Sequence, residues 1–487
     1  MRSPLIALVV ALIITQILSA KTSTSTLYGS HMVFQRDMPI LVWGFDDPGQ
    51  EVVVNFAGTS AKTATNSDGE WRVELPAQSA NAEGQKMTIE GSSSLTLDDI
   101  LIGELWVLFG RSNVGFPLEK TVNGKAVAAE SDLPLVRINS LYDKPSLDPA
   151  KDVQARGWKI MTPQVAGKQS AVGFYFTRAL QRETGIPVGL IKSGWGGSPG
   201  YMWIERSIYE KAFPPGTKEK NLEWLADFEA ESHSYHKSGE GAREYSDQRK
   251  NERIGALYHP FVEPIVGLPV SGIIFYCSGT SAEETEIVAT TYRSAWGRDD
   301  MPFLYVQIPP NGGPKDAKQP WGDPNFNGAF DALDRSGRLQ NSAMIVTIDT
   351  GEKSGKKDIH PPIKEPVGER LALAARGLAL HEELVFRGPR LKDAQFSGGQ
   401  CIITFADVGS GLMAKDGDLE GFAVSSDGRT WEWAKSAEIS DDQVIIESGI
   451  SDPRYVRYGV FGHPTGNLYN KEGLPASVFS TAVSYPE

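Results

Sequence analysis

Five short runs of almost continuously apolar residues constrain the fold of this chain more than any other feature. Runs this apolar are typical of strands that are buried on both faces of a sheet. Helical spacing of apolar residues follows the first run, over 171–183, and the last run, over 365–380. Strands that alternate with helices predict a mostly parallel α/β domain. The five predicted strands are 102–109, 187–191, 270–276, 303–308 and 343–348.

On either side of this region the pattern is typical of β-structure. Residues 28–100 hold short β-branched runs that are separated by turn residues, and 388–487 show the same pattern. A length of 487 residues fits about three domains. We therefore expect an N-terminal β-sandwich over 21–100, an α/β domain over 101–387 and a C-terminal β domain over 388–487.

The first twenty residues are typical of a signal peptide. Arg2 supplies a positive charge, residues 4–19 are nearly all apolar, and Leu18-Ser19-Ala20 resembles a cleavage site. A membrane anchor is the alternative, but the apolar run is shorter than the ~20 residues of a typical span. We expect a mature soluble protein that begins near residue 21 and is secreted or periplasmic.

Charge and composition exclude several classes of partner. The chain has 48 Lys and Arg against 61 Asp and Glu, a net charge of −13, so neither a nucleic-acid partner nor a polybasic membrane surface is expected. A charged stretch at 205–255 interrupts the α/β region and is expected to form solvated surface helices. Its His233 and His236 are expected to be exposed and not to bind metal. Cys277 and Cys401 allow at most one disulfide and no zinc cluster.

Three loops carry residues that can do chemistry. Gly110-Arg111-Ser112-Asn113 and Ser193-Gly194-Trp195-Gly196-Gly197-Ser198 each follow a buried strand, and Asp358-Ile359-His360 precedes the last helix. At the carboxyl end of a parallel strand, a serine hydroxyl is exposed to ligands, and glycines let backbone N–H groups approach them. A histidine can accept the proton of such a serine.

The order of these loops resembles the SGNH-type esterases, and several motifs resemble the sialate O-acetylesterase family over nearly the whole mature chain. The matching segments are Met32-Val33-Phe34-Gln35-Arg36, Gly103-Glu104-Leu105-Trp106, Gly110-Arg111-Ser112-Asn113-Val114, Trp195-Gly196-Gly197-Ser198, Asp358 to Lys364, Val367-Gly368 with Arg370-Leu371-Ala372, Arg457-Tyr458-Gly459 and Gly473-Leu474-Pro475-Ala476-Ser477.

This resemblance implies an SGNH-like domain that hydrolyses an O-acetyl ester on sialic acid or a related sugar, without a metal or an organic cofactor. Ser112 would be the nucleophile and His360 the general base, with Gly196 or Gly197 helping Ser112 to hold the oxyanion. Asp358 would orient His360. The usual spacing in these esterases would place that residue at Lys357, so Asp349 and a backbone carbonyl stay open as alternatives.

The sequence departs from the family pattern at the third-strand loop. Residues 275–281 read Phe-Tyr-Cys-Ser-Gly-Thr-Ser, where the family has an amide and a carboxylate. Thr280 or Ser281 could replace the missing oxyanion donor as a hydroxyl donor, though less rigidly, and Cys277 is expected to be a small apolar filler. Arg111 stands where the family has glutamine and, with Asn113, is expected to line the substrate pocket.

These departures keep rival functions open. A non-catalytic carbohydrate-binding member of the same fold is the main alternative, because a missing oxyanion donor typically costs a factor of ~10²–10³ in rate. An extracellular structural β-protein without a site is the third. The sequence decides neither which sugar is bound nor the oligomeric state.

Overall fold

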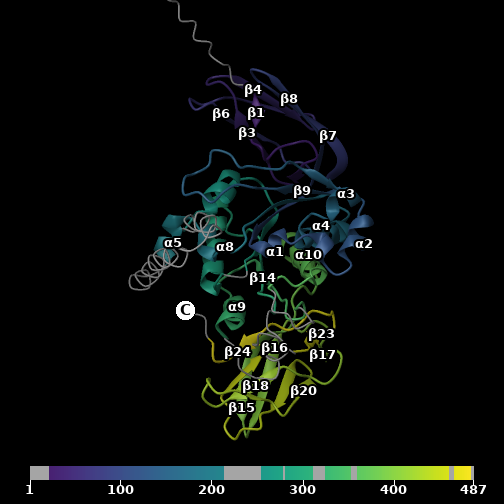
Figure 1. Cartoon of the computed structure of the whole chain (residues 1–487), viewed down its shortest axis with the longest axis vertical. Coiled ribbons are helices and arrows are strands. Elements are labelled where there is room, and N and C mark those ends of the chain that lie inside the picture. The colour runs from purple at the N-terminus through teal and green to yellow at the C-terminus, as the bar shows by residue number, and fades with distance from the viewer. Residues whose placement is uncertain are drawn as a thin grey trace, which may run out of the picture.

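The structure, a computed structural model, describes residues 21–212, 254–277, 280–310, 324–351, 359–459 and 466–483. Within these residues, three regions follow one another along the long axis of the molecule (Figure 1). N-terminal strands lie at one end, an α/β region lies in the middle, and C-terminal strands lie at the other end. The order in space is therefore the order in sequence.

The middle region is built on a mostly parallel sheet, as predicted. Its strands run in the order β10-β9-β11-β8-β12-β13-β14, and every neighbouring pair is parallel except β10 with β9. The five apolar runs all form strands of this sheet. The strands are β8 (Ser94–Gly110), β9 (Leu133–Ser140), β10 (Lys159–Met161), β11 (Val188–Gly194), β12 (Gly272–Tyr276), β13 (Phe303–Val306) and β14 (Ser342–Ile345).

The direction of chain growth reverses at β8. After β8 the chain adds β9 and β11 on one side, and then crosses to add β12, β13 and β14 on the other. Such a reversal leaves a crevice outside the carboxyl ends of the strands, where ligands bind in open α/β sheets. The residues that follow β8 therefore occupy the favoured place for a site.

Two helices cover one face of this sheet at close range. α4 (Ala171–Thr184) and α10 (Glu365–Ala379) pack together, and both match their predicted ranges closely. A Cβ at Gly368 would collide with Tyr175, so the helices approach as closely as they do only because Gly368 has no side chain.

Two further helices were not predicted. α8 (Ala282–Trp296) and α9 (Pro324–Ser336) pack against each other. Ser281 and Glu284 form a capping box at the start of α8, and this Ser-x-x-Glu signal could have revealed the helix. The shorter helices are α1 (Ser112–Gly115), α2 (Gly124–Ala129), α3 (Pro163–Ala166) and α5 (Arg206–Ala212).

Strand β8 is shared between the N-terminal strands and the middle sheet. Its first half pairs with β7 and β2, and its second half pairs with β11 and β12, so the strand crosses the expected boundary at residue 100 without a break. The N-terminal strands are β1 (Ser23–Thr24), β2 (Val33–Gln35), β3 (Ile40–Phe45), β4 (Glu51–Phe56), β5 (Thr59–Ala64), β6 (Glu70–Leu75) and β7 (Asn81–Glu90).

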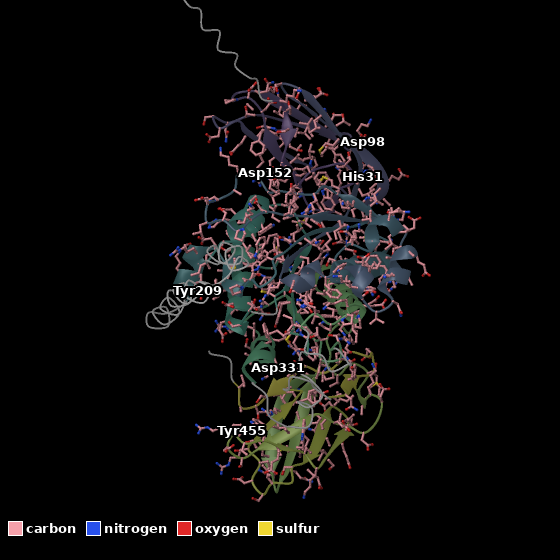
Figure 2. The ribbon with its side chains drawn as sticks, in the orientation of Figure 1. His31, Asp98, Asp152, Tyr209, Asp331 and Tyr455 are labelled. Atoms are coloured by element: carbon pink, nitrogen blue, oxygen red, sulfur yellow. The ribbon has the colours of Figure 1, made fainter. Side chains whose placement is uncertain are left out.

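Polar contacts fix this junction further. Asp152, labelled in Figure 2, accepts hydrogen bonds from the Ser25 hydroxyl and from the Thr26 N–H, the latter at 2.9 Å. Gln35 Oε1 accepts from the Leu105 N–H at 2.8 Å, and Arg36 Nε donates to the buried Glu104 carboxylate at 2.5 Å. The Met32–Arg36 and Gly103–Trp106 motifs thus contact each other and serve the fold.

In the described part of the C-terminal region, the strands form three sheets. Their orders are β15-β16-β21-β20, β17-β23 and β19-β18-β22-β24. The strands are β15 (Arg390–Ser397), β16 (Gln400–Ala406), β17 (Leu412–Ala414), β18 (Phe422–Ser425), β19 (Glu432–Trp433), β20 (Ser436–Ser440), β21 (Gln443–Glu447), β22 (Tyr455–Tyr458), β23 (Leu468–Asn470) and β24 (Phe479–Ser480).

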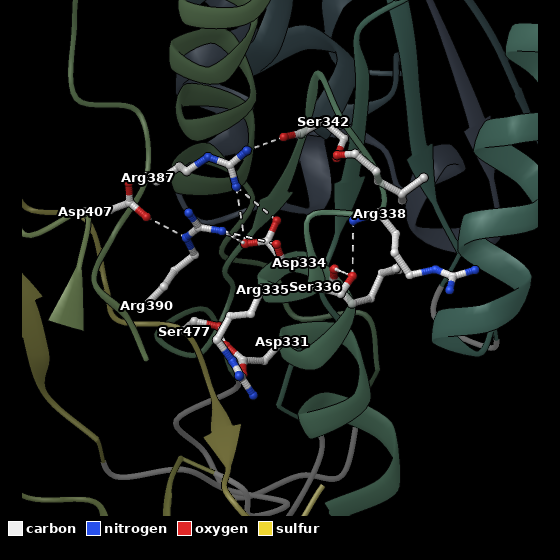
Figure 3. Close-up of polar contacts among 12 residues, drawn as sticks. Asp331, Asp334, Arg335, Ser336, Arg338, Ser342, Arg387, Arg390, Asp407 and Ser477 are labelled. Atoms are coloured by element: carbon white, nitrogen blue, oxygen red, sulfur yellow. Dashed lines mark hydrogen bonds and ion pairs between the residues drawn. The ribbon is translucent and has the colours of Figure 1, made fainter. Parts of the chain in front are cut away.

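Ion pairs hold α9 against this last region (Figure 3). Arg387 and Arg390 each donate to the nearly buried Asp334 at 2.9 Å, and the Ser477 hydroxyl donates to the fully buried Asp331 at 2.7 Å. Arg387 and Arg390 lie on either side of the expected boundary at 387/388. Their contacts with Asp334 therefore fix the position of the connecting segment relative to α9.

Several expectations fall on other parts of the chain. The signal peptide at 1–20, most of the 205–255 stretch, and His233 and His236 lie outside the described residues. The described ends of that stretch are α5 and the buried Ile254. Cys277 and Cys401 are both buried and unbridged. No helix in the described ranges is long and apolar enough to cross a membrane.

Candidate active site

Three strands of the middle sheet end at the same level, and their following loops form the candidate site. Gly110 at the end of β8 is paired with Gly194 of β11 and with Tyr276 of β12. The Arg111 N–H donates to the Tyr276 carbonyl and the Trp195 N–H donates to the Gly110 carbonyl, each at 2.9 Å. These bonds hold the loops after β8, β11 and β12 side by side.

Gly110 is required where the chain turns out of β8. Its φ is +147°, in the range that favours glycine, and a Cβ there would collide with the Tyr276 carbonyl. The backbone can turn tightly only because this position has no side chain. The turn places Ser112 at the first position of helix α1, directly beyond the sheet edge.

Ser112 and His360 lie within hydrogen-bonding distance of each other, although 248 residues separate them in sequence. Ser112 Oγ is 2.5 Å from His360 Nε2. The expectation that these two side chains meet is confirmed by this distance. A hydroxyl beside an imidazole nitrogen is the arrangement that general-base activation of a serine requires.

Asn113 joins the serine helix to the histidine loop. Its Nδ2 donates to the Ile359 carbonyl at 2.9 Å, and its Oδ1 accepts from Lys364 Nζ at 2.6 Å. The Asn113 side chain is completely buried. This placement corrects the expectation that Asn113 lines a substrate pocket, since both atoms of its amide are engaged by the segment that carries His360.

Lys364 is a residue whose part in the site the sequence did not reveal. It is only 1% exposed, and its ammonium lies 5.4 Å from the ring centre of Phe116 and 5.6 Å from that of Tyr276. A buried ammonium needs polar and aromatic neighbours to offset its lost hydration. Its place in the matched segment from Asp358 to Lys364 was the only signal that could have identified it.

A glycine turn that can supply backbone donors lies close to Ser112. If a Cβ were added to Gly196 it would lie 3.9 Å from the Ser112 Cβ, so the Gly196-Gly197 turn lies next to the serine. Among the described residues, the backbone N–H groups of Ser112, Gly196 and Gly197 have no hydrogen-bond acceptor. Such groups can stabilise an oxyanion.

Asp349, the alternative orienting residue for His360, is engaged elsewhere. Arg370 donates to its two oxygens at 2.7 and 2.6 Å, and the Tyr469 hydroxyl donates at 3.1 Å. Burial alone would raise the pKa of Asp349, but the Arg370 hydrogen bonds and charge outweigh burial and lower it. Asp349 is therefore an ionised partner of Arg370. Asp358 lies outside the described residues.

The loop after β12 begins at the site and then leads into α8. Cys277 is buried, with its Sγ 3.8 Å from the Ser198 carbonyl, which fits its expected role as a filler. Ser281 is the N-cap of α8, and its hydroxyl accepts from the Glu284 N–H at 3.1 Å. This corrects the expectation that Ser281 replaces an oxyanion donor. Ser278 and Gly279 lie outside the described residues.

Thr280 and Arg111 have polar groups that no described residue engages. The completely buried Thr280 packs against Gly200, and within the described chain its Oγ1 has no hydrogen-bond partner. The half-buried Arg111 side chain likewise makes no hydrogen bond or ion pair with any described residue. Arg111 therefore keeps its charge available next to Ser112.

Metal ligands are not grouped in the part of the chain that the structure describes. No cluster of three or more His, Cys, Asp or Glu side chains there could hold a metal ion. The polar groups gathered at the sheet edge are a hydroxyl, an imidazole, a guanidinium, an ammonium and backbone N–H groups. This set is suited to attack on an electrophilic carbonyl and to holding negative charge.

Comparisons with known proteins point to carbohydrate esterases. The sialate O-acetylesterase of Mus musculus is 23% identical over 423 residues, which cover 77% of each chain, and that of Homo sapiens is 23% identical over 430 residues, 78% of this chain and 77% of the relative. The crystal structure of a carbohydrate acetylesterase from Xanthomonas citri has a TM-score of 0.79 and 29% identity, covering 95% of this chain and 99% of its own.

No family model matches the chain. The predicted resemblance to the sialate O-acetylesterase family is nevertheless confirmed by these relatives, which cover most of the sequence and most of the fold.

Proposed function

We propose that this protein is an exported carbohydrate O-acetylesterase that uses Ser112 as its nucleophile. The observation that carries the proposal is the 2.5 Å contact between Ser112 Oγ and His360 Nε2, at the carboxyl edge of the sheet where its topology reverses. The relatives named above are esterases of acetylated carbohydrates. We assign the middle region to the SGNH type, with a β-sandwich on either side and residues 1–20 as a signal peptide.

In the first half of the proposed reaction, His360 Nε2 takes the proton of Ser112 while Oγ attacks the acetyl carbonyl. The carbonyl oxygen gains the negative charge, and the N–H groups of Ser112, Gly196 and Gly197 hold it. His360 then gives its proton to the departing sugar oxygen, so the C–O ester bond breaks and an acetyl-serine forms.

In the second half, water attacks the acetyl-serine and passes a proton to His360. That proton returns to Ser112 Oγ as acetate leaves, and the enzyme is restored. Asp358 is our proposed orienting residue for His360, because Asp349 is paired with Arg370. An Asp358→Asn variant should lower kcat and leave KM nearly unchanged, since it alters the orientation of His360 and not substrate contacts.

The test is acetate release from O-acetylated sialic acid and from a neutral O-acetylated sugar. The wild-type protein should release acetate, and Ser112→Ala and His360→Ala should lose activity by at least about 10³-fold while they keep the fold. A covalent organophosphate should label Ser112 only while His360 is present. Full activity of Ser112→Ala would refute the proposed nucleophile.

A non-catalytic carbohydrate-binding protein is the second candidate. The observation that favours it is the third-strand loop, where the family amide is absent and Ser281 serves as a helix cap. Such a protein would bind acetylated sugars without releasing acetate, and Ser112 would not react with the organophosphate. The same two measurements therefore separate the candidates.

A further inference from the structure

A cavity lies next to the candidate active site, and neither Ser112 nor His360 lines it. Its volume is about 910 Å³. Its wall includes Gly194 and Trp195 at the end of β11, and Ile138 and Ser140 at the end of β9. Because Gly196 follows Trp195 and faces Ser112, the wall of this cavity continues into the candidate active site.

Five basic residues and one acidic residue line this cavity. Asp143 is that acid, and the bases are Lys144, Arg156, Lys159, Lys168 and Lys192. Within the described residues none of the five forms an ion pair with an acidic side chain. The whole chain carries a net charge of −13, so this positive cluster is a local exception.

Lys192 is the one of these five bases that is not exposed. It sits on β11, two residues before Gly194, and its half-buried side chain lines the cavity. Burial, and then the nearby charge of Arg156, lower the pKa of Lys192. A bound anion would offset both effects, because it would replace lost hydration and neutralise the repulsion between the two cations.

Aromatic rings accompany the charges. Tyr142 is 43% exposed, and the Arg156 guanidinium lies 4.5 Å from its ring centre, which holds Arg156 at the cavity wall. Trp195 is half-buried in the same wall. Aromatic faces with a few directed polar groups are typical of sites for small organic ligands, and sugar rings pack on such faces.

We propose that this cavity is a subsite for an anionic sugar unit, one that carries a carboxylate or a sulfate and is linked to the unit whose acetyl ester reaches Ser112. The proposal rests on the proposed esterase function for the position of the acetylated unit. It makes the natural substrate an acidic glycan chain and not an isolated acetylated sugar.

The test compares three matched trisaccharides with the mature protein by titration calorimetry. These are trigalacturonate, the uncharged α-1,4-galactotriose and the O-sulfated form of that galactotriose. We expect at least one charged trisaccharide to bind about tenfold more tightly than the uncharged one. Raising the salt concentration should shrink this difference, because salt screens the cationic cluster. The two charged probes distinguish a carboxylate from a sulfate ligand.

Variants locate the effect. Lys159→Gln with Lys168→Gln removes two exposed charges from the cavity wall and should weaken binding of the charged trisaccharide by about tenfold. Lys62→Gln with Lys86→Gln removes the same net charge from the exposed N-terminal strands and should change it less than about twofold. Equal losses in the two double variants would overturn the proposal, since they would indicate a general charge effect.

Other outcomes are equally decisive. Equal affinity for charged and uncharged trisaccharides, or binding of none of them, would overturn the subsite. Equally tight binding of a single-stranded oligonucleotide would assign the cavity to unselective polyanion binding and also overturn it. Hydrolysis of 4-nitrophenyl acetate is measured separately. A wild-type protein that binds the charged trisaccharides but does not hydrolyse this ester would refute the esterase function and not the subsite. A wild-type protein that hydrolyses the ester but does not prefer the charged trisaccharides would refute the subsite alone.

Discussion

Replacing Asn113 by alanine should impair catalysis through the position of His360 rather than through substrate binding. The Nδ2 bond to the Ile359 carbonyl joins two neutral groups and contributes about 1 kcal/mol, and the Oδ1 bond to the Lys364 ammonium contributes about 1.5–3 kcal/mol. Their loss should destabilise the 359–364 segment by about 2.5–4 kcal/mol. Both bonds lie in a fully buried side chain, so water cannot easily replace them.

Because the lost contacts hold the segment that carries His360, the imidazole should move relative to Ser112 Oγ. A displacement of about 1 Å costs about 100-fold in rate, so kcat should fall about 100-fold with KM nearly unchanged. The assays are steady-state hydrolysis of 4-nitrophenyl acetate and the rate at which an organophosphate labels Ser112. The rate of labelling should fall with kcat, because His360 would lose its contact with the serine.

The matched control is Asn113→Asp. It keeps an oxygen for Lys364 but replaces the donor to Ile359 by a second oxygen, so its loss of kcat should lie between those of wild type and Asn113→Ala. A variant that loses thermal stability but keeps the wild-type kcat and the wild-type labelling rate would refute the reasoning, because Asn113 would then serve the fold alone.

Three further predictions concern Arg111, Ser281 and Asp331. The ratio of kcat/KM for an acetylated sialic acid to kcat/KM for a neutral acetylated sugar should fall about tenfold in Arg111→Gln, because no described residue engages the wild-type guanidinium. An unchanged ratio would contradict this prediction. Ser281→Asn should leave the esterase activity within about twofold of wild type, because asparagine is also a good N-cap. A large gain in activity would instead indicate that the side chain at position 281 contacts the oxyanion. Burial raises the pKa of Asp331 to about 6, against ~3.9 in an unfolded chain. Between these two values the folded protein binds more protons than the unfolded chain, so the contribution of Asp331 to the free energy of unfolding falls as the pH rises from about 4 to 6. Asp331→Asn should flatten this part of the pH dependence in urea unfolding, and identical slopes in both proteins would contradict the assignment.

The local pattern of the sequence was enough to predict five of the seven described strands of the middle sheet and the helices α4 and α10, but not α8 or α9. The run 303–308 became β13 (Phe303–Val306), and the helix over 365–380 became α10 (Glu365–Ala379). A strand covered on both faces consists almost entirely of apolar residues, and a helix that packs on one face has apolar residues at regular intervals. Both patterns can be recognised in the sequence itself. The helix α8 was missed, although its capping box is also a local signal.

Contacts between distant segments have no comparable local pattern in the sequence. Gly-x-Ser and Asp-x-His are each weak patterns, and only their order, read through the family resemblance, suggested that Ser112 and His360 meet. The roles of Asn113 and Ser281 were misjudged because each depends on the direction in which the side chain points. Asn113 turns toward the histidine loop, and Ser281 turns toward its own helix.

The basic cavity and the length of β8 were likewise decided by the tertiary structure. Lys159 lies on β10, Lys192 on β11, and Lys144, Arg156 and Lys168 lie in loops, within a chain whose net charge is negative. Composition sums charge over the whole chain, whereas a binding site depends on which charges the fold brings to one surface. The sequence by itself thus determined the apolar strands of the middle sheet, the helices α4 and α10, and the residue types available for chemistry. Only the tertiary structure decided which of those residues share a site, because that depends on the order and register in which the strands pair.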